Sequence, residues 1–427
     1  MKKVVGMSLA AALLLGANAF AFDNVKVSGD AKLYYNTDDK NPNDLFSKAS
    51  SAADAALRLG VTGELLKNVT FGVTGYAIST LGLENNLVSN TWSSAHTATN
   101  SGAGNDVSDE AWIGELWIAA KYGNTTVKAG RMLLDSPLSF SEMWSVAPNS
   151  YEAFVLINQD IPDTTLVAVY AGHSNGVNAV GYTADASTVN SATGIADNTS
   201  GIGLDGIVGA NGTFGTHGAK GANVFALINN SYKPLTAQAW YYNVVNAADA
   251  FWLQGDLNSD MVKGLTLGAQ YTEISPKGVY QGVHDSKGYA FKVGYEGLEN
   301  FKVSAAYSDI DKDSVFKVAN LATNNTVKAQ SKLYTEAFWN YGYVGTPDAE
   351  SWNLSAQYNV QDIAKFGAYY TNVSIDKTNK DMKELALSAT KSFGALDTTL
   401  AYISTDADDQ NSGSQFNSIQ ARLTLNF

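Results

Sequence analysis

The sequence predicts an all-β fold, namely a transmembrane antiparallel β-barrel of about 18 strands with its third loop folded inward. Three observations lead to this fold class. Apolar and polar residues alternate along nearly the whole chain, and a short apolar leader stands at its start. The connections between these segments are short and long by turns along the chain, each short one being followed by a long one in most places. The last segment, SIQARLTLNF, alternates as well and ends on an aromatic residue. In a membrane barrel its apolar side faces lipid and needs no cover.

The leader comprises residues 1–21. Two lysines open it, an apolar stretch follows over 4–17, and the small-residue site AFA ends it. The apolar stretch is shorter than the ~20 residues with which a helix crosses a bilayer. The pattern predicts a secretory signal peptide cut after Ala21 and an exported chain of residues 22–427.

The composition excludes several classes of protein. Cysteine is absent, so no disulfide framework stabilises the exported chain. The leader holds two lysines and no acid, and its removal leaves 26 basic against 41 acidic residues, a net charge of −15. Arginine occurs three times, as Arg58, Arg131 and Arg422. We therefore expect no nucleic-acid partner, because phosphate contacts need clustered Lys and Arg.

Alternation with a period of two marks the strands. In LTLGAQYTE (265–273), Leu267 and Tyr271 fall on one face and Gln270 on the other. We expect a charge to be costly on the first face and tolerated at Gln270 on the second, since lipid meets one face and the lumen the other. The same pattern recurs at 25–35, 55–65, 301–309 and 352–359. A large soluble β-sandwich or β-helix is the alternative; the leader and the terminal aromatic favour the barrel.

The connections predict the number of strands. The short ones are 65–68, 122–124, 160–163, 232–234, 297–300, 360–365 and 393–396, and the long ones are 37–52, 80–109, 134–152, 174–221, 274–286 and 310–350. Short periplasmic turns and long external loops are typical of outer-membrane barrels. Nineteen segments look like strands, one of them Lys332–Asn340. The short connection 360–365 requires a downward strand before it, so 310–350 is one external loop and an even number of 18 strands remains. Such a barrel normally encloses a water-filled channel.

The two ends of the chain are expected to meet. The strand that ends at Phe427 must pair with 25–35, because an open edge in lipid leaves backbone groups unpaired. Phe427 itself looks like the signal that the outer-membrane assembly machinery reads.

One stretch, residues 129–173, resembles the third-loop region of OprD-type porins, a group similar to the Campylobacter major outer-membrane protein. The matching residues are Gly130-Arg131, Asp135, Pro137, Pro148, Tyr151-Glu152 and Asp163-Thr164-Thr165. The resemblance implies eighteen strands, a homotrimer, and passive diffusion of small polar solutes across the outer membrane. One departure is that Ser145 and its neighbours stand where the family usually has an arginine before the loop proline.

The third loop, 134–152, is the candidate pore constriction. Its many apolar residues need a wall to pack on, and the channel interior offers one. The loop carries Asp135, Glu142 and Glu152 and follows Arg131. Carboxylates in a narrow pore attract cations, so these residues predict cation preference. The alternative is that the acids bond to backbone amides or to Arg131 and only fix the loop.

Other motifs carry little weight. GIGLDG (201–206) fits a nucleotide-binding pattern but lacks the strand-then-helix context. The four histidines are scattered, and no catalytic set can be assigned, so we expect neither an enzyme nor a histidine metal site. The acidic runs DIDKD (309–313) and DADD (406–409) are best read as solvated loops; structural Ca²⁺ there is a weaker possibility, and no other cofactor is expected.

The leading function is thus an outer-membrane diffusion channel with cation preference, surrounded by lipid and lipopolysaccharide. A substrate-selective channel of the same fold is one alternative. A surface adhesin or envelope structural protein built on a barrel is another, and an outer-membrane hydrolase is disfavoured because the chain offers no catalytic set.

Overall fold

The computed structural model describes residues 23–427 apart from 94, 97–107, 177–206, 219 and 324–328. The predicted leader, residues 1–21, lies outside the described residues. Among the described residues, no helix is long and apolar enough to cross a membrane.

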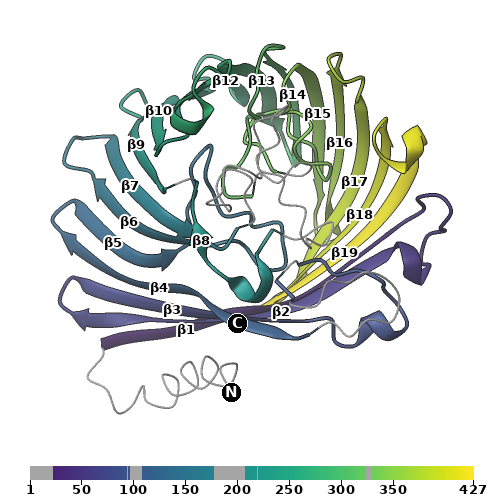
Figure 1. The fold of residues 1–427 in the computed structure, drawn as a ribbon, viewed down its shortest axis with the longest axis horizontal. Helices are drawn as coiled ribbons and strands as arrows, with labels where there is room; N and C mark the ends of the chain where they lie inside the picture. Colours follow the sequence, from purple (N-terminus) through teal and green to yellow (C-terminus); the bar gives the residue numbers. More distant parts are fainter. Residues whose placement is uncertain (1–22, 94, 97–107, 177–206, 219, 324–328) are drawn as a thin grey trace.

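One antiparallel sheet curls round and closes on itself (Figure 1). Its strands are β1 (Asp23–Asp38), β2 (Ser51–Leu66), β3 (Val69–Ser79), β4 (Glu110–Tyr122), β5 (Thr125–Met132), β6 (Tyr151–Asn158), β7 (Thr164–Ser174), β8 (Gly215–Thr216), β9 (Ala222–Asn229), β10 (Leu235–Val244), β11 (Ala248–Asn258), β12 (Leu265–Pro276), β13 (Ser286–Leu298), β14 (Phe301–Ile310), β15 (Ala349–Val360), β16 (Ala364–Ile375), β17 (Met382–Phe393), β18 (Leu396–Ala407) and β19 (Phe416–Asn426). Short 3₁₀ helices lie in the connections: η1 (Lys48–Ser50), η2 (Leu83–Asn85), η4 (Ala210–Gly212), η5 (Gly278–Tyr280) and η6 (Asn411–Gly413).

The wall of the barrel has eighteen strands. β8 holds two residues and pairs with the end of β7, so it belongs to a loop, while β7 pairs directly with β9. β1 pairs with β19 from Asp30↔Asn426 to Asp38↔Ser418. Closure leaves no unpaired edge for lipid to meet. The predicted strand number and the meeting of the first and last strands are confirmed.

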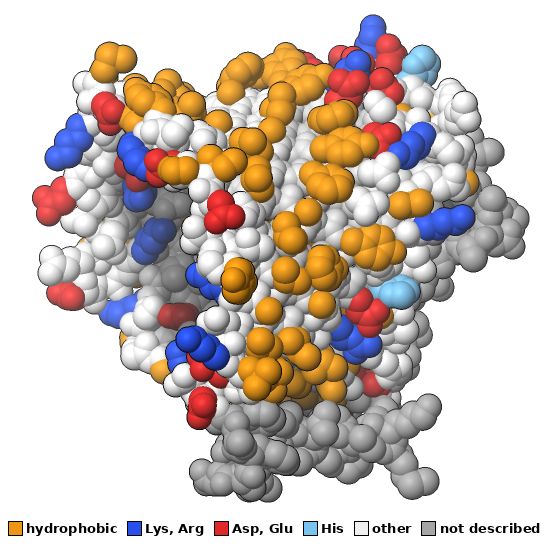
Figure 2. Space-filling view, turned by 90° about the vertical axis from the view of Figure 1, so that its left-hand side faces the viewer, with side chains coloured by type: hydrophobic (Ala, Val, Ile, Leu, Met, Phe, Trp, Pro, Cys, Tyr) orange, Lys and Arg blue, Asp and Glu red, His pale blue; other side chains and the backbone are white. Residues whose placement is uncertain are grey.

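The two faces of the wall follow the alternation. Figure 2 shows a hydrophobic band across the outer face with charged side chains gathered on both sides of it. On β12, Leu267 and Tyr271 lie on this outer face, each 40% exposed, and Gln270 lies on the inner face. The side chain of Gln270 is buried because it donates to the Lys332 carbonyl at 2.9 Å and accepts from the Tyr334 N–H at 3.0 Å. Gln270 lies on the predicted inner face, but because a loop bonds to it, we now expect a charge there to cost these bonds.

Part of the 80–109 loop lies inside the barrel, and so do the described residues of two further long connections: 133–150, called L3, and 311–348, called L7. Residues of both loops belong to apolar clusters with inner-face residues of the wall. The structure assigns no strand to 332–340, which confirms that L7 is one loop. Its apolar side chains gave the segment its strand-like pattern, but they pack on the inner wall and on L3 instead of joining the sheet.

Candidate functional site

The channel interior is the candidate site, and L3 crosses it. Leu138 packs with Trp240 and Tyr242 on β10, and its N–H donates to the Tyr242 Oη at 3.2 Å. Farther along L3, Val146 packs in a cluster with Tyr34 and other side chains of the β1–β4 wall. L3 therefore spans the lumen between two walls, as its apolar residues predicted.

L7 enters the lumen beside L3 and is bonded to it. The Leu321 N–H donates to the Leu138 carbonyl at 2.8 Å, and the Asn320 Nδ2 donates to the Phe140 carbonyl at 2.8 Å. Trp144 of L3 contacts the rings of Trp339 and Tyr341 of L7, with centroids 5.6 and 5.3 Å apart. The two loops form one internal body, so both set the width of the channel.

Glu142 sits within this body and does not line the pore. It is fully buried, and its carboxylate accepts from the Trp144 Nε1 at 2.6 Å, the Asn320 Nδ2 at 2.9 Å and the Thr323 hydroxyl. Burial raises the pKa of Glu142 above its ordinary value. The expectation that Glu142 faces the permeating ions is wrong. Its carboxylate fixes L3 to L7, as the alternative held in part, but through side-chain donors of both loops and not through Arg131.

Asp135 is the acid of L3 that stays accessible. Its side chain is 85% exposed and forms an ion pair with Lys332 of L7. Lys332 also lies over the Phe140 ring, with Nζ 4.7 Å from the centroid. Lys332 therefore offsets part of the charge that Asp135 brings to the lumen.

Arg131 and Glu152 lie on the outer face of the barrel. In register, Arg131 stands between Leu116 and Glu152, and Leu116 is an exposed outer-face residue. The next pair, Met132 and Tyr151, is buried on the inner side against L3. The placement of Arg131 and Glu152 in the constriction is therefore wrong, because they belong to β5 and β6 and occupy outward positions in the register of these strands.

The outward arginine has structural partners. Its Nη2 and Nε each lie 2.9 Å from the Glu152 Oε1, and its Nη1 donates to the Ile113 carbonyl at 3.2 Å. His173 Nδ1 lies 2.8 Å from the Glu152 Oε2. β4 extends beyond the end of β5, at the place where L3 leaves the sheet. There the Arg131 guanidinium donates to the Ile113 carbonyl of β4, which has no residue of β5 paired beside it.

Three basic side chains gather on the inner wall instead: Lys32 on β1, Arg58 on β2 and Arg422 on β19, here called the basic strip. Lys32 Nζ lies 3.4 Å from the Ser145 carbonyl of L3, and Arg58 Nη2 lies 2.5 Å from the Asp30 carboxylate. The Arg422 guanidinium faces the rings of Tyr34, Trp92 and Trp339, with centroids at 5.9, 5.5 and 5.5 Å. Such rings attract a cation electrostatically.

Sequence reasoning missed the basic strip. Each of its residues falls on a polar strand face, so alternation alone places it inward. Their proximity depends on the closure of β19 on β1 and on the register that sets Tyr34 opposite Arg422. Closure was predicted, but register was not.

The acidic runs show no metal site. Among the residues that the structure describes, no group of three or more His, Asp or Glu side chains is arranged to hold a metal ion. Asp311 accepts the Asp313 N–H at 2.8 Å, Asp408 accepts the Asp381 N–H at 2.9 Å, and Asp409 accepts the Tyr343 hydroxyl. These carboxylates serve as loop acceptors, so the calcium reading gains no support.

Comparison with known proteins places this barrel in a family. The family model described as Gram-negative porin matches residues 8–332 and 259–426. The chain belongs to the Gram-negative porins. No curated protein is significantly similar to this porin in sequence.

Solved structures confirm the architecture of the porin. It is similar to OccK8 (OprE) of Pseudomonas aeruginosa, with a TM-score of 0.70 and 16% identity over 96% of this chain and 100% of that one. It is also similar to the outer membrane protein opdK of the same organism, with a TM-score of 0.69 and 12% identity over 95% and 99% of the two chains. The porin is thus a non-enzymatic channel of the Gram-negative outer membrane, and the resemblance to OprD-type porins is confirmed.

Proposed function

We propose that this porin lets small polar solutes and ions diffuse passively through its lumen, with a preference for cations. The observation that supports passive diffusion is the polar lining of the lumen near the periplasmic turns. There, half-buried hydroxyl side chains pair across the inner wall: Ser304 with Ser355 at 2.7 Å, and Thr390 with Thr399 at 3.1 Å. Hydroxyl groups both donate and accept, so they serve many polar solutes alike.

The proposed cation preference has two sources. L7 begins and ends with acids at the external mouth, namely Asp311, Asp313 and Asp348. Asp135, from the predicted constriction set, adds a carboxylate to the lumen, although Lys332 offsets it. Negative side chains at a mouth raise the local concentration of cations, and this effect falls as salt rises.

The charge preference is tested by the zero-current potential in a KCl gradient across a planar bilayer. The wild-type channel is expected to favour K⁺, and the triple variant Asp311→Asn, Asp313→Asn, Asp348→Asn is expected to bring the potential closer to zero. Glu152→Gln, on the outer face, serves as the matched control and should leave it unchanged. A triple variant that folds and keeps the full cation preference would show that these acids do not set it.

A substrate-selective channel for anionic solutes is the second candidate, and the basic strip favours it. Cationic side chains on one inner wall provide a path for carboxylates, as Arg forms paired hydrogen bonds with them. In that case the wild-type potential has the opposite sign, anion flux saturates, and Arg422→Gln reduces both effects. The sign of one measurement separates the two candidates.

We also propose that the porin is a homotrimer that associates through the outer face of β1–β4, within a membrane of lipid and lipopolysaccharide. Among described strand residues, the exposed aromatic side chains lie on β6 to β18, apart from Tyr122 at the end of β4. Amphipathic rings mark the faces that meet lipid interfaces. Their scarcity on β1–β3 supports contact with protein there.

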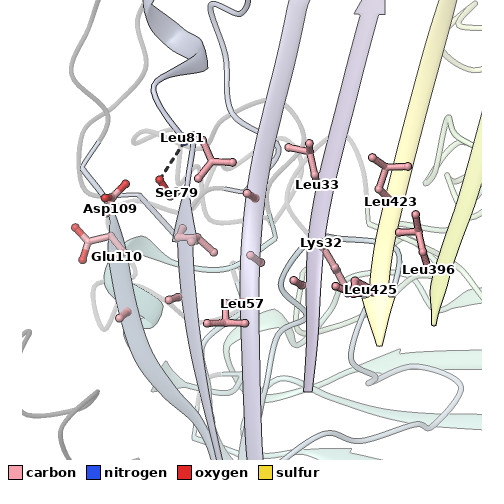
Figure 3. A pocket seen from close by; sticks show the side chains of 16 residues that line it. Lys32, Leu33, Leu57, Ser79, Leu81, Asp109, Glu110, Leu396, Leu423 and Leu425 are labelled. Atoms are coloured by element: carbon pink, nitrogen blue, oxygen red, sulfur yellow. Dashed lines mark hydrogen bonds between the residues drawn. The ribbon is translucent and has the colours of Figure 1, made fainter. Parts of the chain in front are cut away.

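A hollow of about 630 Å³ on the same face supports this contact (Figure 3). Alanines of β1–β4 form its floor, and the labelled leucines of β1, β2, β18 and β19 stand around it. Ala77→Phe should fill the hollow and yield monomers in light scattering, whereas Ala269→Phe, on the outer face of β12, should leave the trimer intact. Trimers from both variants would exclude this face.

The leader is proposed to be removed after Ala21 during export, which the N-terminal sequence of the mature porin would test.

A further inference from the structure

We propose that Glu384 on β17 is the positioning residue that holds L7 inside the lumen and thereby sets the conductance of the channel. The inference rests on the proposed function, since it concerns the width of that diffusion path. Glu384 would thus act on conduction although its carboxylate is buried and does not face the solute.

The carboxylate of Glu384 collects consecutive N–H groups of L7. It is 1% exposed on the inner face of the wall. It accepts from the Phe338 N–H at 2.7 Å, from the Trp339 N–H at 3.2 Å and from Asn340, whose N–H and Nδ2 lie at 2.7 and 2.8 Å. Every hydrogen bond recorded for this side chain thus comes from one short segment of L7.

The energetics make this contact an anchor. A buried carboxylate is costly unless donors compensate it, and hydrogen bonds to a charged acceptor are stronger than neutral ones. Successive backbone N–H groups aimed at one point form an anion-binding concavity. Residues 338–340 belong to no helix or strand, so without the carboxylate three neighbouring donors would be buried with no acceptor.

A second acid nearby does not compete for these donors. Burial, with a further contribution from the charge of Glu384, raises the pKa of Glu336 on L7 to about 8. Glu336 accepts instead from the Ser331 and Ala337 N–H groups, at 2.5 and 2.9 Å. The N–H groups of 338–340 are therefore left to Glu384.

Residues 338–340 of L7, which Glu384 binds, lie where L7 meets L3 and the 80–109 loop inside the barrel. Trp339 lies 5.1 Å from Trp92 of the 80–109 loop and 5.6 Å from Trp144 of L3, measured between ring centroids. The Arg422 guanidinium of the basic strip is 5.5 Å from the same ring. Asn340 Nδ2 also donates to Thr405 on β18 at 2.8 Å, a weaker neutral bond to the wall. Loss of the Glu384 carboxylate would free residues 338–340 from β17 and widen the path there, while Gln270 on β12 still bonds to Lys332 and Tyr334.

The proposed role of Glu384 is separate from the folding of the barrel. The strand pairing of β17 uses backbone groups, and the Glu384 side chain bonds to no other residue of the wall. Its loss should leave the barrel closed and release only L7. Barrel integrity and channel behaviour can therefore be measured separately.

The test uses the full-length mature porin with Glu384→Gln, Glu384→Ala and the matched control Ser388→Ala, which lies on the same face of β17. The shift in gel migration on heating reports whether the barrel is folded, planar-bilayer recording reports conductance, and limited chymotrypsin digestion reports exposure of Phe338 and Trp339. Both Glu384 variants should fold, conduct more with added open-channel noise, and gain a chymotrypsin cleavage at Phe338 or Trp339. The control should match the wild type.

Asn340→Asp provides the same test from the side of L7, because it sets a second carboxylate against Glu384 and leaves every residue of the wall unchanged. It remains informative if the Glu384 variants do not fold. In a background lacking 332–341, Glu384→Gln should have no further effect on conductance. Folded variants at both positions with wild-type conductance and no new cleavage would overturn the proposal. A wild-type porin that does not conduct at all would instead refute the proposed function.

Discussion

Removal of Phe427, or its replacement by Asp, is expected to leave most of the porin unassembled. The terminal residue closes the barrel: its carbonyl accepts the Gly29 N–H at 2.8 Å, and its N–H donates to the Gly29 carbonyl at 3.0 Å. Its ring covers Gly29, where a Cβ would stand 2.7 Å from the Phe427 Cε2. Each unpaired backbone group left in lipid costs several kcal/mol. Heat-modifiable protein in isolated outer membranes measures the loss.

Phe427→Tyr is the matched control, since it keeps both the backbone pairing and an aromatic ring. We expect it to assemble nearly as the wild type does. Wild-type amounts of folded protein from the truncated chain would show that neither the terminal pairing nor the predicted assembly signal is needed.

The second large effect is expected at Leu354, in the middle of β15. It lies on the outer face, 48% exposed, while the adjacent Ser355 faces the lumen and bonds to Ser304. Leu354→Arg should lower the free energy of unfolding by roughly 2–4 kcal/mol, the cost of Arg on a lipid face near the midplane. Ser355→Arg should cost far less and change the conductance instead. A urea titration in lipid vesicles compares the two, and equal destabilisation would show that the faces are assigned wrongly.

The barrel could be predicted because its determinants are local. Period-two alternation fixes which side of each strand meets lipid, and turn length fixes on which side of the membrane each connection lies. These two rules led to eighteen strands and to the reading of 310–350 as one loop, despite the strand-like residues 332–340. Closure then followed from the need to pair every backbone group in lipid.

The interior could not be predicted in the same way, because it depends on contacts between distant segments. The Glu142 carboxylate accepts hydrogen bonds from L7 residues about 180 positions away, and Glu384 accepts them from a segment more than 40 positions away. Arg131 and Glu152 face outward because the register of β5 and β6 with their neighbours turns both side chains toward lipid. A loop sequence shows that carboxylates are present, but not whether they face water or another loop.

The most direct test of the central claim is a planar-bilayer recording of the purified, heat-modifiable mature porin. The account predicts stepwise increases in current as channels insert, a current proportional to voltage at low voltage, and a zero-current potential of cationic sign in a KCl gradient. Folded protein that inserts into the bilayer without any conductance steps would contradict it.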